Sequence, residues 1–94
     1  MPQTYSLSQN YPNPFNPTTV IKYSIPTNEN GRGNLVNLKI FDLLGRELKV
    51  LVQEIQSPGN YEIGFNSSDL TSGIYFYQLT AGDYKETKKM ILLK

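Results

Sequence analysis

The carboxylates are the side chains of this sequence best suited to acid–base chemistry, and they stand far apart along the chain. A glycoside hydrolase needs two carboxyl groups that face each other across a cleft. A chain of 94 residues with compact turns has little material for such a cleft. Most of these carboxylates fall at predicted turns or on predicted outer faces, where a solvated charge is the usual role. The scattered residues are Asp42, Glu47, Glu54, Glu62, Asp69, Asp83 and Glu86.

Nucleophilic catalysis has equally little support in the sequence. Ser67 and Ser68 precede Asp69, a grouping typical of a capped helix N-terminus. The sequence contains no histidine and no cysteine, so there is no imidazole to activate a serine and no thiol to replace it. We therefore predict that the protein is not an enzyme.

Metal, nucleic-acid and membrane binding are not indicated either. One polar loop contains Asn28, Glu29, Asn30 and Asn34, but a single charge among four oxygen donors makes a poor calcium site. The absence of cysteine excludes a structural cysteine zinc site. A net charge of +1 provides no basic footprint for nucleic acid, and no segment reaches the roughly 18 apolar residues that span a bilayer. We predict no cofactor, no metal and no direct membrane insertion.

Three consecutive aromatic residues, Tyr75, Phe76 and Tyr77, allow a carbohydrate-binding interpretation. Side chains alternate between the two faces of a strand, so either the tyrosines or the phenylalanine must face the core. The other set could form a platform that stacks on sugars or on a partner. Ordinary packing against tyrosines of neighbouring strands is the simpler interpretation, and both stay open at this point.

Short strands are the elements that would position these side chains. Turn residues recur about every eight to twelve positions, and no long window keeps the apolar period of a helix. Because short turns join antiparallel partners, we predict an all-β fold: an immunoglobulin-like antiparallel β-sandwich of about seven short strands, in a single domain over residues 1–94. The predicted strands are Ser6–Gln9, Thr18–Ile25, Leu35–Asp42, Glu47–Ile55, Tyr61–Phe65, Ile74–Thr80 and Tyr84–Leu93.

Local patterns add detail to this scheme. Gly45 is expected to close a hairpin with a positive φ, and the apolar run Val50–Val52 indicates a bulge. The polar stretch Ser67–Gly73 suits a single helical turn that crosses between the sheets. Tyr75 is a candidate for a tyrosine corner, in which a tyrosine at the start of a late strand bonds to the backbone a few residues upstream.

A proline-rich segment, about residues 10–19, precedes the first long strand. Pro12, Pro14 and Pro17 fix φ at about −65° and push each preceding residue out of the α region, so the backbone must run extended. Tyr11 and Phe15 offer two apolar anchors in this segment. We predict that the segment is docked on the sandwich through both aromatic side chains.

Four motifs, taken in order, resemble the C-terminal sorting domain of cargo proteins of the bacterial type IX secretion system. They are the entry motif Tyr11–Pro17, the central hairpin Ile40–Arg46, the glycine–tyrosine strand Gly73–Tyr77 and the basic–aliphatic strand Lys88–Lys94. The resemblance covers nearly the whole chain. The structural positions of the first two motifs are Tyr11, Pro12, Asn13, Pro14, Phe15, Asp42, Gly45 and Arg46.

The resemblance implies an immunoglobulin-like domain at the C-terminal end of an exported cargo protein. It implies recognition by the outer-membrane type IX machinery, a shuttle protein and a sortase-like peptidase, and then attachment to the cell surface or release. We expect a monomer that continues an N-terminal cargo, whose signal peptide lies elsewhere, and we interpret Met1 as an expression start. The candidate recognition residues are Gly73, Tyr75, Lys88, Lys89 and Lys94.

The terminal strand also has a physical argument. A strand that ends the chain can lie at a sheet edge, where unpaired N–H and C=O groups allow strand addition. The three lysines either supply charge for a specific acceptor or keep the edge soluble, and the spacing from Lys89 to Lys94 differs from the family's tail. Two other classes stay open: an accessory carbohydrate- or protein-binding module of a secreted enzyme, and a structural spacer resembling the immunoglobulin-like domain of the hook-capping protein.

Overall fold

The computed structural model describes residues 4–27 and 33–94, and its regular elements are all strands. No helix in these two ranges could span a membrane. The prediction of an all-β fold is confirmed. The strands are β1 (Ser6–Leu7), β2 (Thr18–Ile25), β3 (Asn34–Phe41), β4 (Glu47–Gln56), β5 (Gly59–Asn66), β6 (Gly73–Ala81) and β7 (Tyr84–Leu92).

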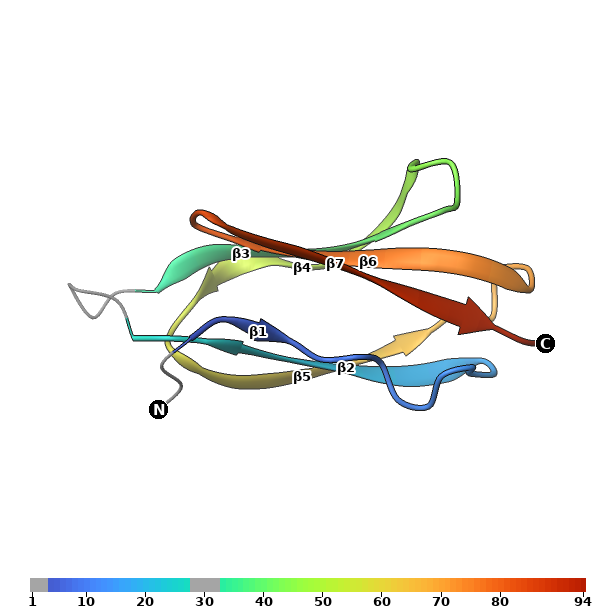
Figure 1. Cartoon of the computed structure of the whole chain (residues 1–94), viewed down its shortest axis with the longest axis horizontal. Helices are drawn as coiled ribbons and strands as arrows, with labels where there is room; N and C mark the ends of the chain where they lie inside the picture. Colours follow the sequence, from blue (N-terminus) through green and yellow to red (C-terminus); the bar gives the residue numbers. More distant parts are fainter. Residues whose placement is uncertain (1–3, 28–32) are drawn as a thin grey trace.

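The strands form two sheets that face each other as the layers of a sandwich (Figure 1). One sheet has the order β1-β2-β5 and the other the order β4-β3-β6-β7, with neighbouring strands antiparallel. The larger sheet corresponds to the GFC sheet of an immunoglobulin-like domain, extended by the strand beside C. Strands β4 and β7 are therefore its two edges.

The core lies between the sheets and is built from alternate residues of the strands. In β2, the side chains of Ile21, Tyr23 and Ile25 are buried, and across the core Leu38 of β3 and Tyr77 of β6 are fully buried. This two-residue period is the one predicted from the sequence of β2, whose observed bounds match the prediction.

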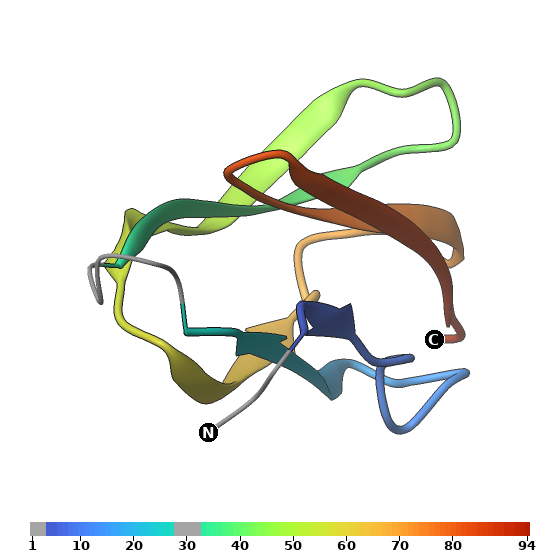
Figure 2. The same ribbon diagram turned by 60° about the vertical axis from the view of Figure 1, so that its left-hand side comes forward.

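The β3–β4 hairpin projects beyond the four-stranded sheet (Figure 2) and is closed by a tight turn. Gly45 has a φ of 84°, the left-handed conformation predicted for it. Asp42 Oδ1 accepts hydrogen bonds from the amides of Leu44 and Arg46, both at 2.9 Å. The pairing register of β3 with β4 shifts at Leu51, which confirms the bulge predicted in this run.

The segment from Ser67 to Gly73 contains a reverse turn, and the prediction of a helical turn is wrong. A hydrogen bond of 2.8 Å from the Leu70 amide to the Ser67 carbonyl closes this turn. Ser67 is buried, and its amide and hydroxyl both donate to the carbonyl of Pro17, at 2.9 and 2.8 Å. Such side-chain bonds to the backbone compete with helical hydrogen bonding, so the chain crosses between the sheets in a turn.

Tyr75 forms the predicted tyrosine corner at the start of β6. Its side chain is buried, and its hydroxyl donates to the carbonyl of Thr71 at 2.7 Å. Tyr61 makes a bond of the same spacing to the carbonyl of Ser57, at 2.6 Å. Each bond ties the start of a strand to the turn before it.

Candidate recognition site at the terminal strand

Strand β7 lies at the edge of the four-stranded sheet, as predicted from its place at the end of the chain. One side of it pairs with β6 along its whole length. The proline-rich entry segment lies against its other side near the C-terminus (Figures 1 and 2). Two motifs at opposite ends of the sequence therefore meet at one edge.

Phe15 extends the sheet by one residue beyond β7. Its amide donates to the carbonyl of Ile91 and its carbonyl accepts from the amide of Leu93, both at 3.0 Å. The side chain of Asn13 accepts a hydrogen bond from the Ile91 amide at 2.9 Å. These outward-facing backbone groups are therefore occupied, and the expectation of a free edge is wrong for this part of the strand.

The two aromatic anchors predicted for the entry segment lie in opposite environments. Phe15 is only 2 % exposed, and its ring centroid lies 6.1 Å from that of Phe65. Tyr11 is 80 % exposed, so its predicted role as a buried anchor is wrong. Its backbone pairs with Val20 in both directions, at 3.0 and 2.9 Å, and this pairing turns its neighbour Asn10 inward and the tyrosine ring toward solvent.

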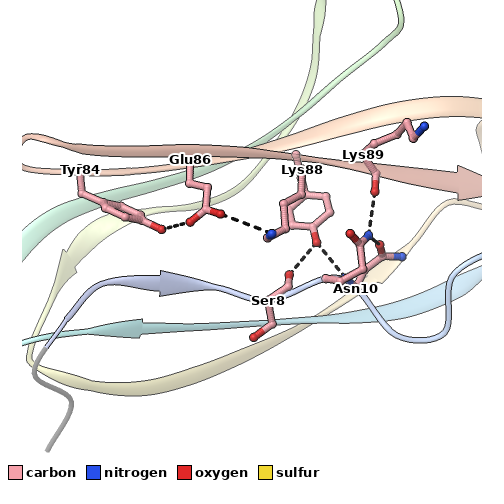
Figure 3. Close-up of polar contacts among 8 residues, drawn as sticks. Ser8, Asn10, Tyr84, Glu86, Lys88 and Lys89 are labelled. Carbon is pink, nitrogen blue, oxygen red and sulfur yellow. Dashed lines mark hydrogen bonds and ion pairs between the residues drawn. The ribbon is translucent and has the colours of Figure 1, made fainter.

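Asn10 takes the inward position expected of the tyrosine, and Figure 3 shows its surroundings. The backbone N–H of Asn10 donates to the Tyr77 hydroxyl at 2.8 Å, and that hydroxyl donates to the carbonyl of Ser8 at 2.6 Å. Gln9 Nε2 donates to the carbonyl of Lys89 on β7 at 2.7 Å. Burial raises the pKa of Tyr77 to about 12. Sequence patterns do not identify Asn10 or Tyr77 as docking residues, because their hydrogen bonds join residues that lie far apart in the sequence.

The three candidate lysines do not form one cluster. Lys88 lies on the inner face of β7 and pairs with Glu86 at 3.4 Å (Figure 3). Lys89 lies on the outer face and is exposed. Lys94 Nζ donates to the carbonyl of Ser68 at 2.8 Å. The positive charge of the tail is therefore divided among three surroundings.

Glu86 is held between Lys88 and Tyr84 on the inner face of β7 (Figure 3). The hydroxyl of Tyr84 donates to the Glu86 carboxylate, and this bond is the main cause that lowers the pKa of Glu86. Burial is the main cause that raises the pKa of Tyr84, and the hydrogen bond to the negatively charged Glu86 raises it further. The Tyr84 ring also stacks on Tyr5, with centroids 4.8 Å apart. The group connects β7 to the chain that enters β1.

The central hairpin motif lies apart from this edge, in the turn that projects from the sandwich (Figure 1). Asp42 Oδ2 pairs with Arg46 Nε at 2.7 Å, and the hydrogen bond from the Arg46 backbone is the main cause that lowers the pKa of Asp42. Gly73 begins β6 opposite Leu92 of the terminal strand. The fold therefore brings together the entry motif, the glycine–tyrosine strand and the terminal strand at one edge, while the hairpin motif meets the glycine–tyrosine strand where Phe41 pairs with Phe76.

The aromatic run of β6 is divided between the two faces of its sheet. Tyr75 and Tyr77 are buried, so they do not present a platform for sugars. Phe76 points outward and is half-buried. The core-packing interpretation therefore holds for both tyrosines.

The serine–aspartate grouping has structural partners instead of a catalytic arrangement. Ser67 is bound to the backbone of Pro17, and Asp69 pairs with Lys49 at 2.9 Å. Asn34 Nδ2 donates to the hydroxyl of Tyr5 at 2.6 Å. The other calcium candidates, residues 28–30, lie outside the described residues.

The sequence was also compared with known proteins. The sequence model of a family described as "Secretion system C-terminal sorting domain" matches residues 9–93. The chain belongs to this family. The matched range of this type IX sorting domain includes the entry motif, the hairpin, β6 and β7. Proteins that carry such a domain are exported to the cell surface or released. Searches of curated proteins and of solved structures gave no match.

Proposed function

We propose that this domain is a non-catalytic sorting signal that directs an N-terminal cargo protein across the bacterial outer membrane by the type IX system. The observation that carries the proposal is the family match over residues 9–93. The position of β7 at a sheet edge, with the exposed Lys89 on its outer face, supports recognition at this end of the domain.

The partners that we propose are a shuttle protein that binds the folded domain and a sortase-like peptidase that removes it. The cargo is then attached to the cell surface or released. In this scheme Lys89 and Lys94 contact the shuttle protein, because both side chains lie at the surface. Tyr75 and Gly73 act by positioning β6 against the terminal strand, and Lys88 by its ion pair with Glu86.

A carbohydrate-binding module receives less support, because the two tyrosines that would form its platform are buried. A protein-binding module or a spacer has the same fold requirements as a sorting signal. These classes differ in what happens to an attached protein, and export therefore separates them.

A reporter enzyme with an N-terminal signal peptide and residues 1–94 at its C-terminus tests the proposal in a host that has a type IX system. We expect the reporter at the cell surface or in the medium, and the same reporter without the domain in the periplasm. The same distribution for both proteins would contradict the sorting function and favour a spacer or a binding module.

A further inference from the structure

Strand addition is restricted at both edges of the four-stranded sheet. At β7, Asn13 and Phe15 already occupy outward backbone groups of Ile91 and Leu93. At β4, the register with β3 shifts twice, and bulges of this kind turn an edge strand away from further pairing. A partner therefore has better access to the outer face of this sheet than to its edges.

Apolar side chains lie together on this outer face across three adjacent strands. Phe41 of β3 pairs with Phe76 of β6, and Ile74 of β6 pairs with Ile91 of β7. Ile74 is 39 % exposed, and the other three are half-buried. A shallow depression lies beside Phe41, Phe76 and Gly45. An apolar strip with a hollow that a side chain could enter is typical of a docking surface.

The charged residues around this strip are mostly lysines. Lys89 lies opposite Phe76, and Lys85 lies farther along the same exposed face of β7, opposite Thr80. The acidic residue among the described strand residues of this face is Glu47, and its charge is neutralised by an ion pair with Lys39 at 3.0 Å. Within residues 4–27 and 33–94, Lys85 and Lys89 form no ion pair. The face therefore has an apolar centre and an uncompensated positive charge.

The outer face of the other sheet is different. Val20 lies opposite Gly64 on one side and opposite the exposed Tyr11 of the entry segment on the other, so no apolar strip continues from β2 onto β5. Lys22 and Glu62 lie opposite each other with 3.8 Å between their charged groups, so the charges there are balanced. This face provides a control surface of the same domain.

We infer that the outer face of the four-stranded sheet, centred on Ile74, Phe76 and Lys89, is the surface by which the domain docks on a protein that offers apolar side chains bordered by carboxylates. Charge complementarity supports this partner, because an apolar centre with a charged rim of one sign selects a rim of the opposite sign. The inference rests on the proposed sorting function and assigns it a surface.

Four variants of the exported reporter fusion test the inference. Lys89→Glu and Ile74→Ser change the proposed surface. Lys22→Glu and Val20→Ser make the same chemical changes on the outer face of the other sheet. We expect export to fall by at least about tenfold for the first two variants and to stay near the unmodified level for the two controls. Thermal unfolding of the purified domains should show that all four variants fold.

Three results would overturn the inference. The first is unchanged export of Lys89→Glu and Ile74→Ser, and the second is an equal loss of export in the controls. The third is binding of the purified domain to vesicles of phosphatidylcholine and phosphatidylglycerol that Lys89→Glu abolishes, since this indicates a membrane partner. If the unmodified fusion itself stays in the periplasm, the proposed function fails first and the inference fails with it.

Discussion

The aromatic residues of the entry segment have different roles at the scale of single residues. Phe15 is buried against the core, whereas Tyr11 projects into solvent from a backbone that is paired with β2. Composition identifies both as apolar anchors, but only the three-dimensional pairing decides which ring faces inward. Replacing each of the two residues with alanine should therefore change the free energy of unfolding by very different amounts.

Replacing Phe15 with alanine should lower the free energy of unfolding by about 3–5 kcal/mol, because the change leaves a cavity in the core. Replacing Tyr11 with alanine should change it by less than about 0.5 kcal/mol, as is usual for an exposed site. Urea denaturation of both purified variants measures the difference. Equal effects of the two substitutions would contradict the docking described here.

Tyr75 permits a test of the tyrosine corner. Tyr75→Phe removes the bond to the Thr71 carbonyl and keeps the ring, so the free energy of unfolding should fall by about 1 kcal/mol. Tyr61→Phe is the matched control, because its bond to Ser57 is more exposed and should contribute less. Urea denaturation gives both values. A larger effect for Tyr61→Phe would show that the buried corner is not the stabilising one.

The entry segment covers part of the β7 edge at the scale of elements. Asn13→Ala should remove the acceptor of the Ile91 amide, and hydrogen exchange followed by NMR should show this amide exchanging at least about tenfold faster. Asn16→Ala is the matched control, because Asn16 also precedes a proline and is exposed. If Ile91 keeps its protection in Asn13→Ala, the side chain does not cap this edge.

The β3–β4 turn depends on a glycine that has a positive φ. Gly45→Ala should destabilise the domain by about 1–2 kcal/mol, since an alanine is strained at a φ of 84°. Gly64→Ala is the control: a Cβ at this position meets nothing within 4 Å and its backbone is extended, so the change should be neutral or slightly stabilising. Thermal unfolding compares the two. An equal loss of stability would contradict the special role of Gly45.

Local patterns in the sequence predict part of this architecture. The alternation of β2, the bulge at Leu51 and the turn at Gly45 each follow from a few adjacent residues, and all three are confirmed. The cap on β7 depends on contacts between Asn13 and Ile91, which lie at opposite ends of the chain. Ser67 likewise finds its partner in Pro17. A short stretch of sequence contains no signal for such long-range contacts. The prediction of a free edge at β7 and the prediction of a helical turn after Ser67 were both wrong for this reason.

Buried tyrosines should make the whole molecule less stable as the pH rises through the alkaline range. Burial raises the pKa of Tyr77 to about 12 and also raises those of Tyr23 and Tyr84. Between an ordinary pKa of about 10 and the raised value, the unfolded chain loses protons that the folded domain keeps. The free energy of unfolding should therefore be nearly constant from neutral pH to about pH 10 and should then fall.

Urea denaturation at a series of pH values from neutral to about 12 measures this dependence. A single cooperative transition is expected at each pH, because one core serves the whole sandwich. Tyr77→Phe should reduce the alkaline loss, because it removes the buried hydroxyl whose pKa is raised. A flat profile through the alkaline range would contradict the burial of these hydroxyl groups.

The central claim concerns the transport of a cargo by the intact domain. The most direct measurement is the fraction of a signal-peptide–reporter–domain fusion that reaches the cell surface or medium in two isogenic hosts, one of which lacks the type IX outer-membrane translocon. We expect export in the first host and periplasmic accumulation of intact fusion in the second. Export that is equal in the two hosts, or absent from both, would contradict the assignment of this domain as a type IX sorting signal.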